Sequence, residues 1–180
     1  MPTPSRTGYT FAGWFTAASG GTQVTASTVV KILANQTLYA HWTVKSYTYT
    51  LGSGTGVSTS GSTASGSKNY GTTITLKATT NTGYTWSQWV SSNTSLVPNK
   101  SSANTSFTMP AGNITMTPSA TANTYFVRYN GNGATSGSMS NSSHTYNISK
   151  ALTANNFSRS GYEFIGWSTS ADGEVVYTDK

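Results

Sequence analysis

The chain has 180 residues, no cysteine, a net charge of +6 and only 8% charged residues. Without cysteine, disulfide frameworks, thiolate metal sites and cysteine nucleophiles are excluded. Aromatic residues make up 12% of the chain, which indicates folded modules because disordered segments are poor in aromatics. The basic residues are spread evenly and form no cluster, so specific binding to nucleic acid is not expected. No apolar run or lipidation motif is present, so membrane insertion is not expected either.

The first predicted element in chain order is an aromatic strand that occurs three times. Its pattern is G-Y-x-[FW]-x-x-W, and the copies begin at Gly8, Gly83 and Gly161, with offsets of 75 (83 − 8) and 78 (161 − 83) residues. A long period of this kind predicts an array of similar modules. In a regular strand the Trp would leave the face of the two earlier aromatics unless a bulge intervenes, and Gly13 and Gly166 favour a bulge. The repeated residues, predicted to form a core, are Gly8, Tyr9, Phe11, Trp14, Gly83, Tyr84, Trp86, Trp89, Gly161, Tyr162, Phe164 and Trp167.

The rest of the chain is predicted to be mainly β, because apolar and polar residues alternate in several short runs. Strands are expected at Thr37–Trp42, Tyr47–Leu51, Ile74–Leu76, Ser106–Met109, Ile114–Met116 and Tyr125–Tyr129. Turns are expected at Gly20-Gly21, Met109–Asn113 and Asp172-Gly173, where glycine, proline or aspartate favours them. The small residues of Gly52–Ser67 predict a loop, and Ser149–Ala154 is the segment that favours a short helix.

The repeats align beyond the aromatic motif, and the alignment divides the chain into three parts. Tyr70, for example, corresponds to Tyr146, which lies 76 residues later (146 − 70). We expect residues 1–44 to be the C-terminal part of a module, residues 45–121 a complete module and residues 122–180 the N-terminal part of another. The predicted linkers are Thr43–Ser46 and Ser119–Asn123. Partial modules at both ends indicate a segment of a longer protein.

These residues resemble a known family. The run R-T-G-Y-T-F-A-G-W-F-T, followed by Gly-Gly-Thr and T-L-Y-A-H-W-T, is similar to the internalin-type B-repeat, also called the Listeria–Bacteroides repeat. Residues 125–176 resemble the opening of that repeat, and residues 47–118 resemble its divergent version, with Trp86 and Gln88 as departures from the motif. The resemblance implies small β-grasp-like modules in tandem, in bacterial surface or secreted proteins, with no catalytic residues.

The sequence offers little for catalysis or metal binding. Its carboxylates, Glu163, Asp172, Glu174 and Asp179, all lie after residue 162, so residues 1–162 lack the paired acids of glycoside hydrolysis. His41 lies in a predicted strand and His144 in a predicted solvated loop, without the partners of a nucleophilic triad. Two separated histidines without cysteine give no zinc pattern, and Asp172-Gly173-Glu174 is better explained by a turn than by a calcium site. We therefore expect no catalytic site, cofactor or metal.

The predicted function is that of a non-enzymatic spacer or stalk in a bacterial surface or secreted protein. Trp42 and Trp86, which the copies do not all share, are the candidates for stacking on a sugar, so carbohydrate binding is one alternative, with cell-surface glycans or proteins as partners. A second alternative is self-assembly. Residues 1–44 of one chain would complete residues 122–180 of another by strand addition, and such a head-to-tail contact builds a filament.

Overall fold

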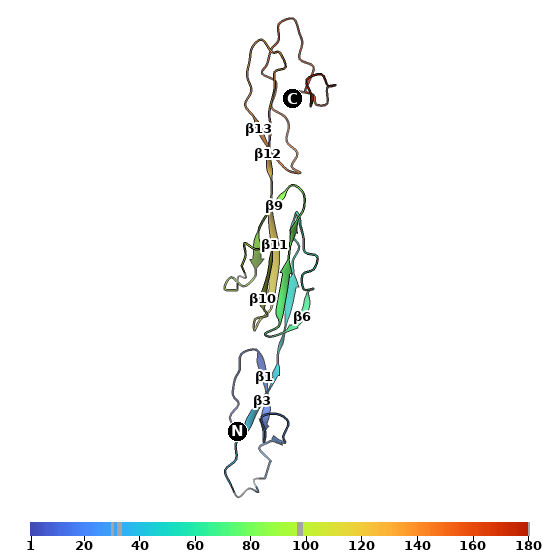
Figure 1. Cartoon of the computed structure of the whole chain (residues 1–180). Helices are drawn as coiled ribbons and strands as arrows, with labels where there is room; N and C mark the ends of the chain where they lie inside the picture. The colour runs from blue at the N-terminus through green and yellow to red at the C-terminus, as the bar shows by residue number, and fades with distance from the viewer. Residues whose placement is uncertain (30, 32–33, 97–98, 180) are drawn as a thin grey trace. The chain divides into compact units, whose positions relative to one another are not determined.

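The computed structural model describes residues 1–29, 31, 34–96 and 99–179 (Figure 1). Within these residues all regular structure is β, in thirteen strands, which confirms the predicted mainly β fold. By their contacts the residues form two compact units. Unit 1 comprises residues 1–81 and 86–120, and unit 2 comprises residues 82–85 and 121–180.

The N-terminal part of unit 1 is an antiparallel sheet in the order β2-β1-β3, with β1 (Tyr9–Phe15), β2 (Gln23–Val24) and β3 (Tyr39–Val44). The register of β1 against β3 shifts between Phe11 and Gly13, so an extra residue bulges there. Gly13 has φ +137°, a conformation that glycine adopts without strain. The bulge predicted at Gly13 is thus confirmed, and Trp14 meets Phe11 with 5.6 Å between ring centroids.

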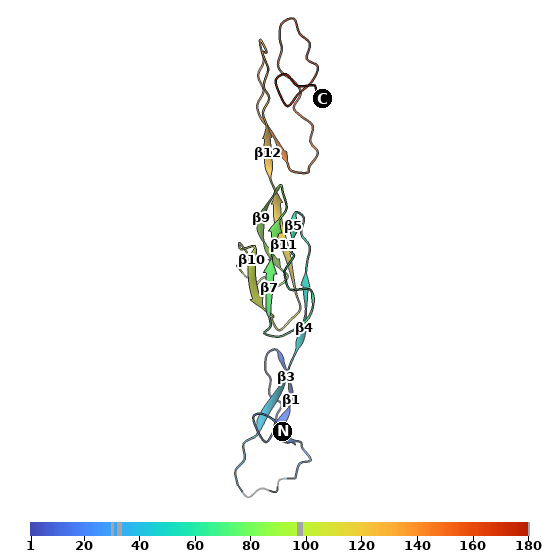
Figure 2. The same cartoon turned by 45° about the vertical axis from the view of Figure 1, so that its right-hand side comes forward.

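The larger part of unit 1 is built on a four-stranded sheet in the order β6-β4-β11-β9. The neighbours β4 and β11 run parallel, with Ile114 opposite Tyr49 and Met116 opposite Leu51. β10 pairs antiparallel with β7 in a second sheet, and β5 pairs with β8 (Figure 2). The strands are β4 (Ser46–Leu51), β5 (Val57–Ser58), β6 (Gly66–Asn69), β7 (Thr73–Lys77), β8 (Thr79–Thr80), β9 (Tyr84–Ser91), β10 (Asn104–Thr108) and β11 (Ile114–Ala122).

The four-stranded sheet and the β10-β7 sheet both contribute residues to the buried core of unit 1. Alternation along β7 directs Ile74 and Leu76 to the same face, where both are 0% exposed. The whole cluster consists of Tyr49, Ile74, Leu76, Ala78, Trp89, Phe107, Met109, Ile114 and Met116. Full burial of one large apolar side chain contributes about 1.5–3 kcal/mol, so this cluster is the main source of stability in unit 1.

Unit 2 contains less regular structure. Its hairpin pairs β12 (Thr124–Val127) with β13 (Ser142–Thr145) in antiparallel register. Beyond the hairpin, single bridges join Ser136 to Ser158 and Trp167 to Tyr177. The turn expected at Asp172-Gly173 lies between the two ends of the second bridge, where the Gly173 amide donates to the Ser170 carbonyl.

Two expectations for unit 2 are wrong. The helix expected at Ser149–Ala154 is an irregular segment. Its Thr153 amide donates to the Tyr129 hydroxyl at 2.8 Å, which takes the place of a helical bond to a carbonyl four residues earlier. His144, expected in a solvated loop, lies in β13, and its Nε2 is 2.8 Å from the Ser142 hydroxyl oxygen.

The connections in the chain are shorter than the sequence predicts. β3 continues to Val44 and β4 begins at Ser46, so Lys45 is the one residue between them. β11 likewise continues through the second predicted linker, and Asn123 alone precedes β12. The expected loop at Gly52–Ser67 contains β5 and the start of β6. β6 forms by pairing with β4, and the small residues of this segment do not predict that pairing.

Candidate functional site

The aromatic motif arranges its rings in the same way in all three copies. The centroid distances are 5.6 Å for Phe11 and Trp14, 5.6 Å for Trp86 and Trp89, and 4.9 Å for Phe164 and Trp167, each edge to face. The Trp therefore shares the face of the earlier aromatic even in the middle copy, where Gln88 replaces the second glycine.

The first glycine of the motif contacts a tyrosine far along the chain. In unit 1 the Gly8 carbonyl accepts a hydrogen bond from the Lys45 amide, and the Lys45 carbonyl accepts one from the Tyr70 amide, both at 2.8 Å. The Tyr70 ring lies against Gly8 and meets the Tyr9 ring edge to face, with 5.8 Å between centroids and 77° between planes. The Arg6 guanidinium lies over the Tyr9 ring, 4.0 Å from its centroid.

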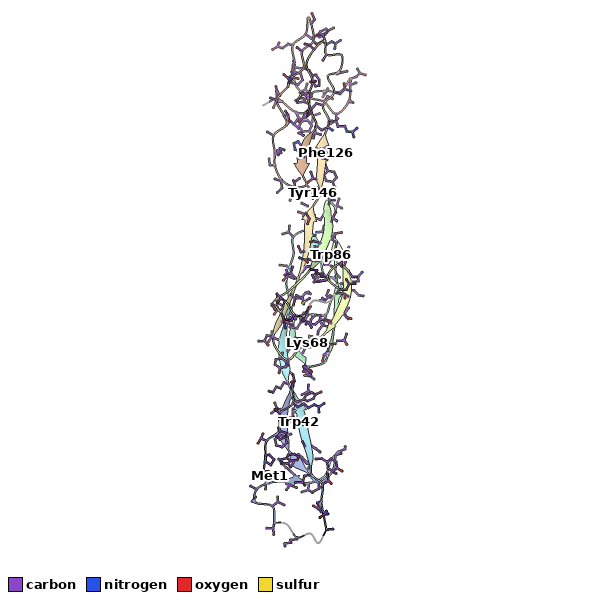
Figure 3. The ribbon with its side chains drawn as sticks, turned by 90° about the vertical axis from the view of Figure 1, so that its left-hand side faces the viewer. Met1, Trp42, Lys68, Trp86, Phe126 and Tyr146 are labelled. Atoms are coloured by element: carbon purple, nitrogen blue, oxygen red, sulfur yellow. The ribbon has the colours of Figure 1, made fainter. Side chains whose placement is uncertain are left out.

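The same contacts occur within unit 2. The Gly83 carbonyl accepts from the Asn123 amide, and the Asn123 carbonyl accepts from the Tyr146 amide, both at 2.8 Å. The rings of Tyr84 and Tyr146 meet edge to face at 5.6 Å and 78° (Tyr146 is labelled in Figure 3). We name this set of contacts the glycine–tyrosine joint. Its members are Gly8, Tyr9, Lys45 and Tyr70 in unit 1, and Gly83, Tyr84, Asn123 and Tyr146 in unit 2.

Two separate features require glycine in the joint. Gly8 has φ +79° and Gly83 has φ +83°, a left-handed conformation that strains any residue with a Cβ. A Cβ on either glycine would also overlap the ring of Tyr70 or Tyr146. The repeat alignment places these two tyrosines at equivalent positions, but their shared spacing does not show which glycine each ring meets, so the sequence does not predict the joint.

The two candidate ligand-stacking residues are partly buried. The Trp42 ring lies 5.6 Å from the Phe11 ring, edge to face. Trp86, labelled in Figure 3, packs against the core cluster. Its Nε1 donates to the Ser101 carbonyl at 3.0 Å. The aromatic side chains that reach furthest into solvent are others, with Phe126 at 67% and Tyr162 at 68% exposed.

The histidines and Asp179 make separate local hydrogen bonds. His41 Nε2 is 2.9 Å from the Ala17 carbonyl oxygen, so this nitrogen carries the proton, and its ring stacks on Phe15. The Asp179 carboxylate accepts a hydrogen bond from the Asn155 amide at 2.9 Å. Among the described residues, no group of three or more His, Asp or Glu side chains is placed to hold a metal ion. The same residues include no helix long and apolar enough to cross a membrane.

Unit 2 also contains an open cavity of about 860 Å³ beside Tyr129, whose lining includes His144, Lys150 and Trp167. Burial alone would raise the pKa of Tyr129, but hydrogen bonds with Ser142 and Thr153 and the positive charge of Lys150 hold that pKa below its usual value. Asp179 lines the same cavity as His144. The His144 ring is hydrogen-bonded to the Ser142 hydroxyl, and the Asp179 carboxylate accepts from the Asn155 amide, so each of the two groups has its own local partner.

Comparison with known proteins agrees with the repeated architecture. Residues 1–41 and 125–180 match the Listeria-Bacteroides repeat domain, and residues 47–124 match the divergent InlB B-repeat domain. A stretch of 48 residues, 27% of this chain, is 44% identical to Internalin H of Listeria monocytogenes. It spans only 9% of the length of Internalin H. No solved structure matches the chain. The chain belongs to the Listeria-Bacteroides repeat domain family, with a divergent InlB B-repeat in its middle.

Proposed function

We propose that the chain is a non-enzymatic spacer segment of a bacterial cell-surface or secreted protein. The observation that carries this proposal is the glycine–tyrosine joint, which recurs with equal hydrogen-bond lengths and with ring planes at 77° and 78°. A contact repeated without change between successive repeat segments favours a role in which each segment is held to the next. A single binding module would have no need of the repetition.

Lys45 supports this role because its backbone is fixed at both ends. It is the single residue between β3 and β4, and both its amide and its carbonyl are hydrogen-bonded in the joint. Each such bond contributes about 0.5–1.5 kcal/mol, and an edge-to-face ring pair contributes a similar amount. A one-residue connection held in this way resists bending, in contrast to the flexible chain of a Gly/Ser linker. Asn123 makes the same two bonds in unit 2.

The surface chemistry supports a passive role. Only 8% of residues are charged, and none of the four acids precedes Glu163, so most of the chain offers neutral polar side chains to its surroundings. Such a surface gives few charged groups for a specific partner to recognise. The two histidines and Asp179 are engaged in separate local hydrogen bonds, which favours a non-enzymatic role.

The stiffness of the Lys45 connection can be measured directly, since the chain has no natural cysteine to compete for a label. Ser19→Cys and Ser60→Cys place two spin labels at exposed positions of unit 1, on either side of Lys45. Pulsed electron double resonance then gives the distribution of distances between the labels. A spacer predicts a narrow distribution, and insertion of Gly-Ser-Gly-Ser after Lys45 should broaden it.

The control is the same insertion after Ala171, in a turn of unit 2, which should leave the distribution unchanged. If the unmodified chain already gives a distribution as broad as the chain with the insertion at Lys45, the joint does not restrict motion. The spacer function would then be rejected.

A further inference from the structure

The third copy of the motif repeats one half of the glycine–tyrosine joint. The Tyr162 amide donates to the Arg159 carbonyl at 3.1 Å, as the Tyr9 amide donates to the Arg6 carbonyl at 3.1 Å. The Arg159 guanidinium lies over the Tyr162 ring at 4.1 Å, against 4.0 Å for Arg6 over Tyr9. Gly161 has φ +78°, within a degree of Gly8. The backbone at Gly161 and the cation–π pair therefore have the conformation of the Gly8 copy, whose joint is complete.

The other half of this third joint is not supplied by any described residue. Apart from Gly161 and its two chain neighbours, no described residue has an atom within 4 Å of the position that a Cβ on Gly161 would occupy, whereas at Gly8 and Gly83 a tyrosine ring fills that position. Gly8 and Gly83 are buried, but Gly161 is exposed, and Tyr162 is 68% exposed. Gly161 and Tyr162 thus expose to solvent the surface that a tyrosine ring covers at Gly8 and at Gly83.

We propose that Gly161 and Tyr162 form a docking surface for the opening hairpin of another repeat of the same type. The occupant is a tyrosine that follows a two-strand pairing like that of β4 with β6, in the position of Tyr70. Its ring covers Gly161 and meets Tyr162 edge to face. The residue that precedes its first strand, in the position of Lys45, donates its amide to the Gly161 carbonyl.

The two complete joints indicate that the occupant is a whole hairpin and not an isolated aromatic residue. In each of them the ring is placed by two backbone hydrogen bonds at 2.8 Å, which only a chain in the correct register provides. Tyr70 and Tyr146 are already engaged with Gly8 and Gly83, so the ring for Gly161 comes from an additional hairpin. This inference is independent of the spacer function, since the surface would bind such a hairpin whether or not the joint is stiff.

The test uses a longer chain that contains an additional hairpin with a tyrosine in the position of Tyr70. Trp167 pairs with Tyr177 as Trp14 pairs with Val24, so the end of the chain corresponds to Ser27. Residues 28–121 are therefore appended directly after residue 180. The probe is the Hα resonance of Gly161, because a proton that points at the face of an aromatic ring is shifted upfield.

In the unextended chain, Gly8 and Gly83 are expected to show upfield Hα resonances and Gly161 an ordinary one, since only the first two face a ring. In the extended chain, the Gly161 resonance should move upfield to join them. An unchanged Gly161 resonance in the extended chain would overturn the proposal.

Two further arms make the result specific. Tyr70→Ser in the appended copy alone should return the Gly161 resonance to its original position while the Gly8 and Gly83 resonances stay upfield, and an upfield Gly161 in that variant would contradict the proposed contact. Raising the concentration of the unextended chain should leave Gly161 unchanged. An upfield shift that grows with concentration would show that a second copy gives up its own Tyr70 or Tyr146, against the requirement for an additional hairpin.

Discussion

Replacing Tyr49 by phenylalanine is expected to stabilise unit 1, by an amount that increases at alkaline pH. Tyr49 is 0% exposed, and its hydroxyl has no hydrogen-bond partner among the described residues. A buried polar group without a partner costs about 1–3 kcal/mol. Tyr49→Phe removes that group and keeps the ring, so the free energy of unfolding at pH 7 should rise by up to this amount.

The pH dependence follows from the pKa of Tyr49, which burial raises from 10.0 to about 12. Below pH 10 the tyrosine is neutral in both the folded and the unfolded chain. Between pH 10 and 12 the unfolded chain loses the proton while the folded chain keeps it, so the wild type loses stability. The loss is about 1.4 kcal/mol at pH 11 and approaches about 2.7 kcal/mol above pH 12, and the phenylalanine variant does not suffer it.

The measurement is urea unfolding of both proteins, followed by tryptophan fluorescence at pH 7, 9, 10 and 11. Other groups that titrate in this range affect both proteins alike, so the difference between the two free energies isolates Tyr49. Tyr47→Phe, on the same strand at a partly exposed position, is the control at pH 7, where its free energy of unfolding should stay within about 0.5 kcal/mol of the wild type. A loss of stability in Tyr49→Phe at pH 7, or a difference that stays constant to pH 11, would refute the reasoning.

Two further substitutions test the joint and the core with matched controls. Gly83→Ala and Gly71→Ala both act at φ +83°, but only at Gly83 does the new Cβ meet a ring, that of Tyr146. Gly71→Ala should lower the free energy of unfolding by about 1 kcal/mol through left-handed strain alone. Gly83→Ala should lower it clearly more, because the new Cβ overlaps a ring, and should expose the Tyr146 amide to hydrogen exchange. Equal losses of stability in the two variants would contradict the joint. Phe107→Ala should cost about 3–5 kcal/mol in urea unfolding because Phe107 is 7% exposed, whereas Phe126→Ala, at 67% exposed, should stay within about 0.5 kcal/mol.

The sequence predicts a strand correctly where apolar and polar residues alternate within the strand itself. Ile74 and Leu76 alternate with threonine, and a strand forms there as predicted. Gly13 marked the bulge in β1 because glycine is the residue that a bulge in this conformation favours. β6 (Gly66–Asn69) was missed because no apolar alternation marks it, and it exists only through its pairing with β4.

The joint itself was beyond prediction for a different reason. All six strands from β1 to β6 separate Tyr70 from Gly8 along the chain, and nothing local to either residue indicates that they meet. The helix expected at Ser149–Ala154 failed on a contact of the same kind, since the Thr153 amide bonds to Tyr129, 24 residues earlier. Local sequence propensity carries no information about partners this distant in the chain. Tertiary contacts therefore determine both the joint and the irregular conformation of Ser149–Ala154.

The parallel pairing of β4 with β11 determines how unit 1 carries tension. β4 begins this part of the chain at Ser46, and β11 runs beside it in the same direction toward Ala122. A pull that enters at the start of β4 and leaves at the end of β11 drags the two neighbours in opposite directions along their shared axis. The hydrogen bonds that hold Ile114, Thr115 and Met116 against β4 are then loaded together in shear. They do not open one after another, as they would in an antiparallel hairpin pulled apart from its ends.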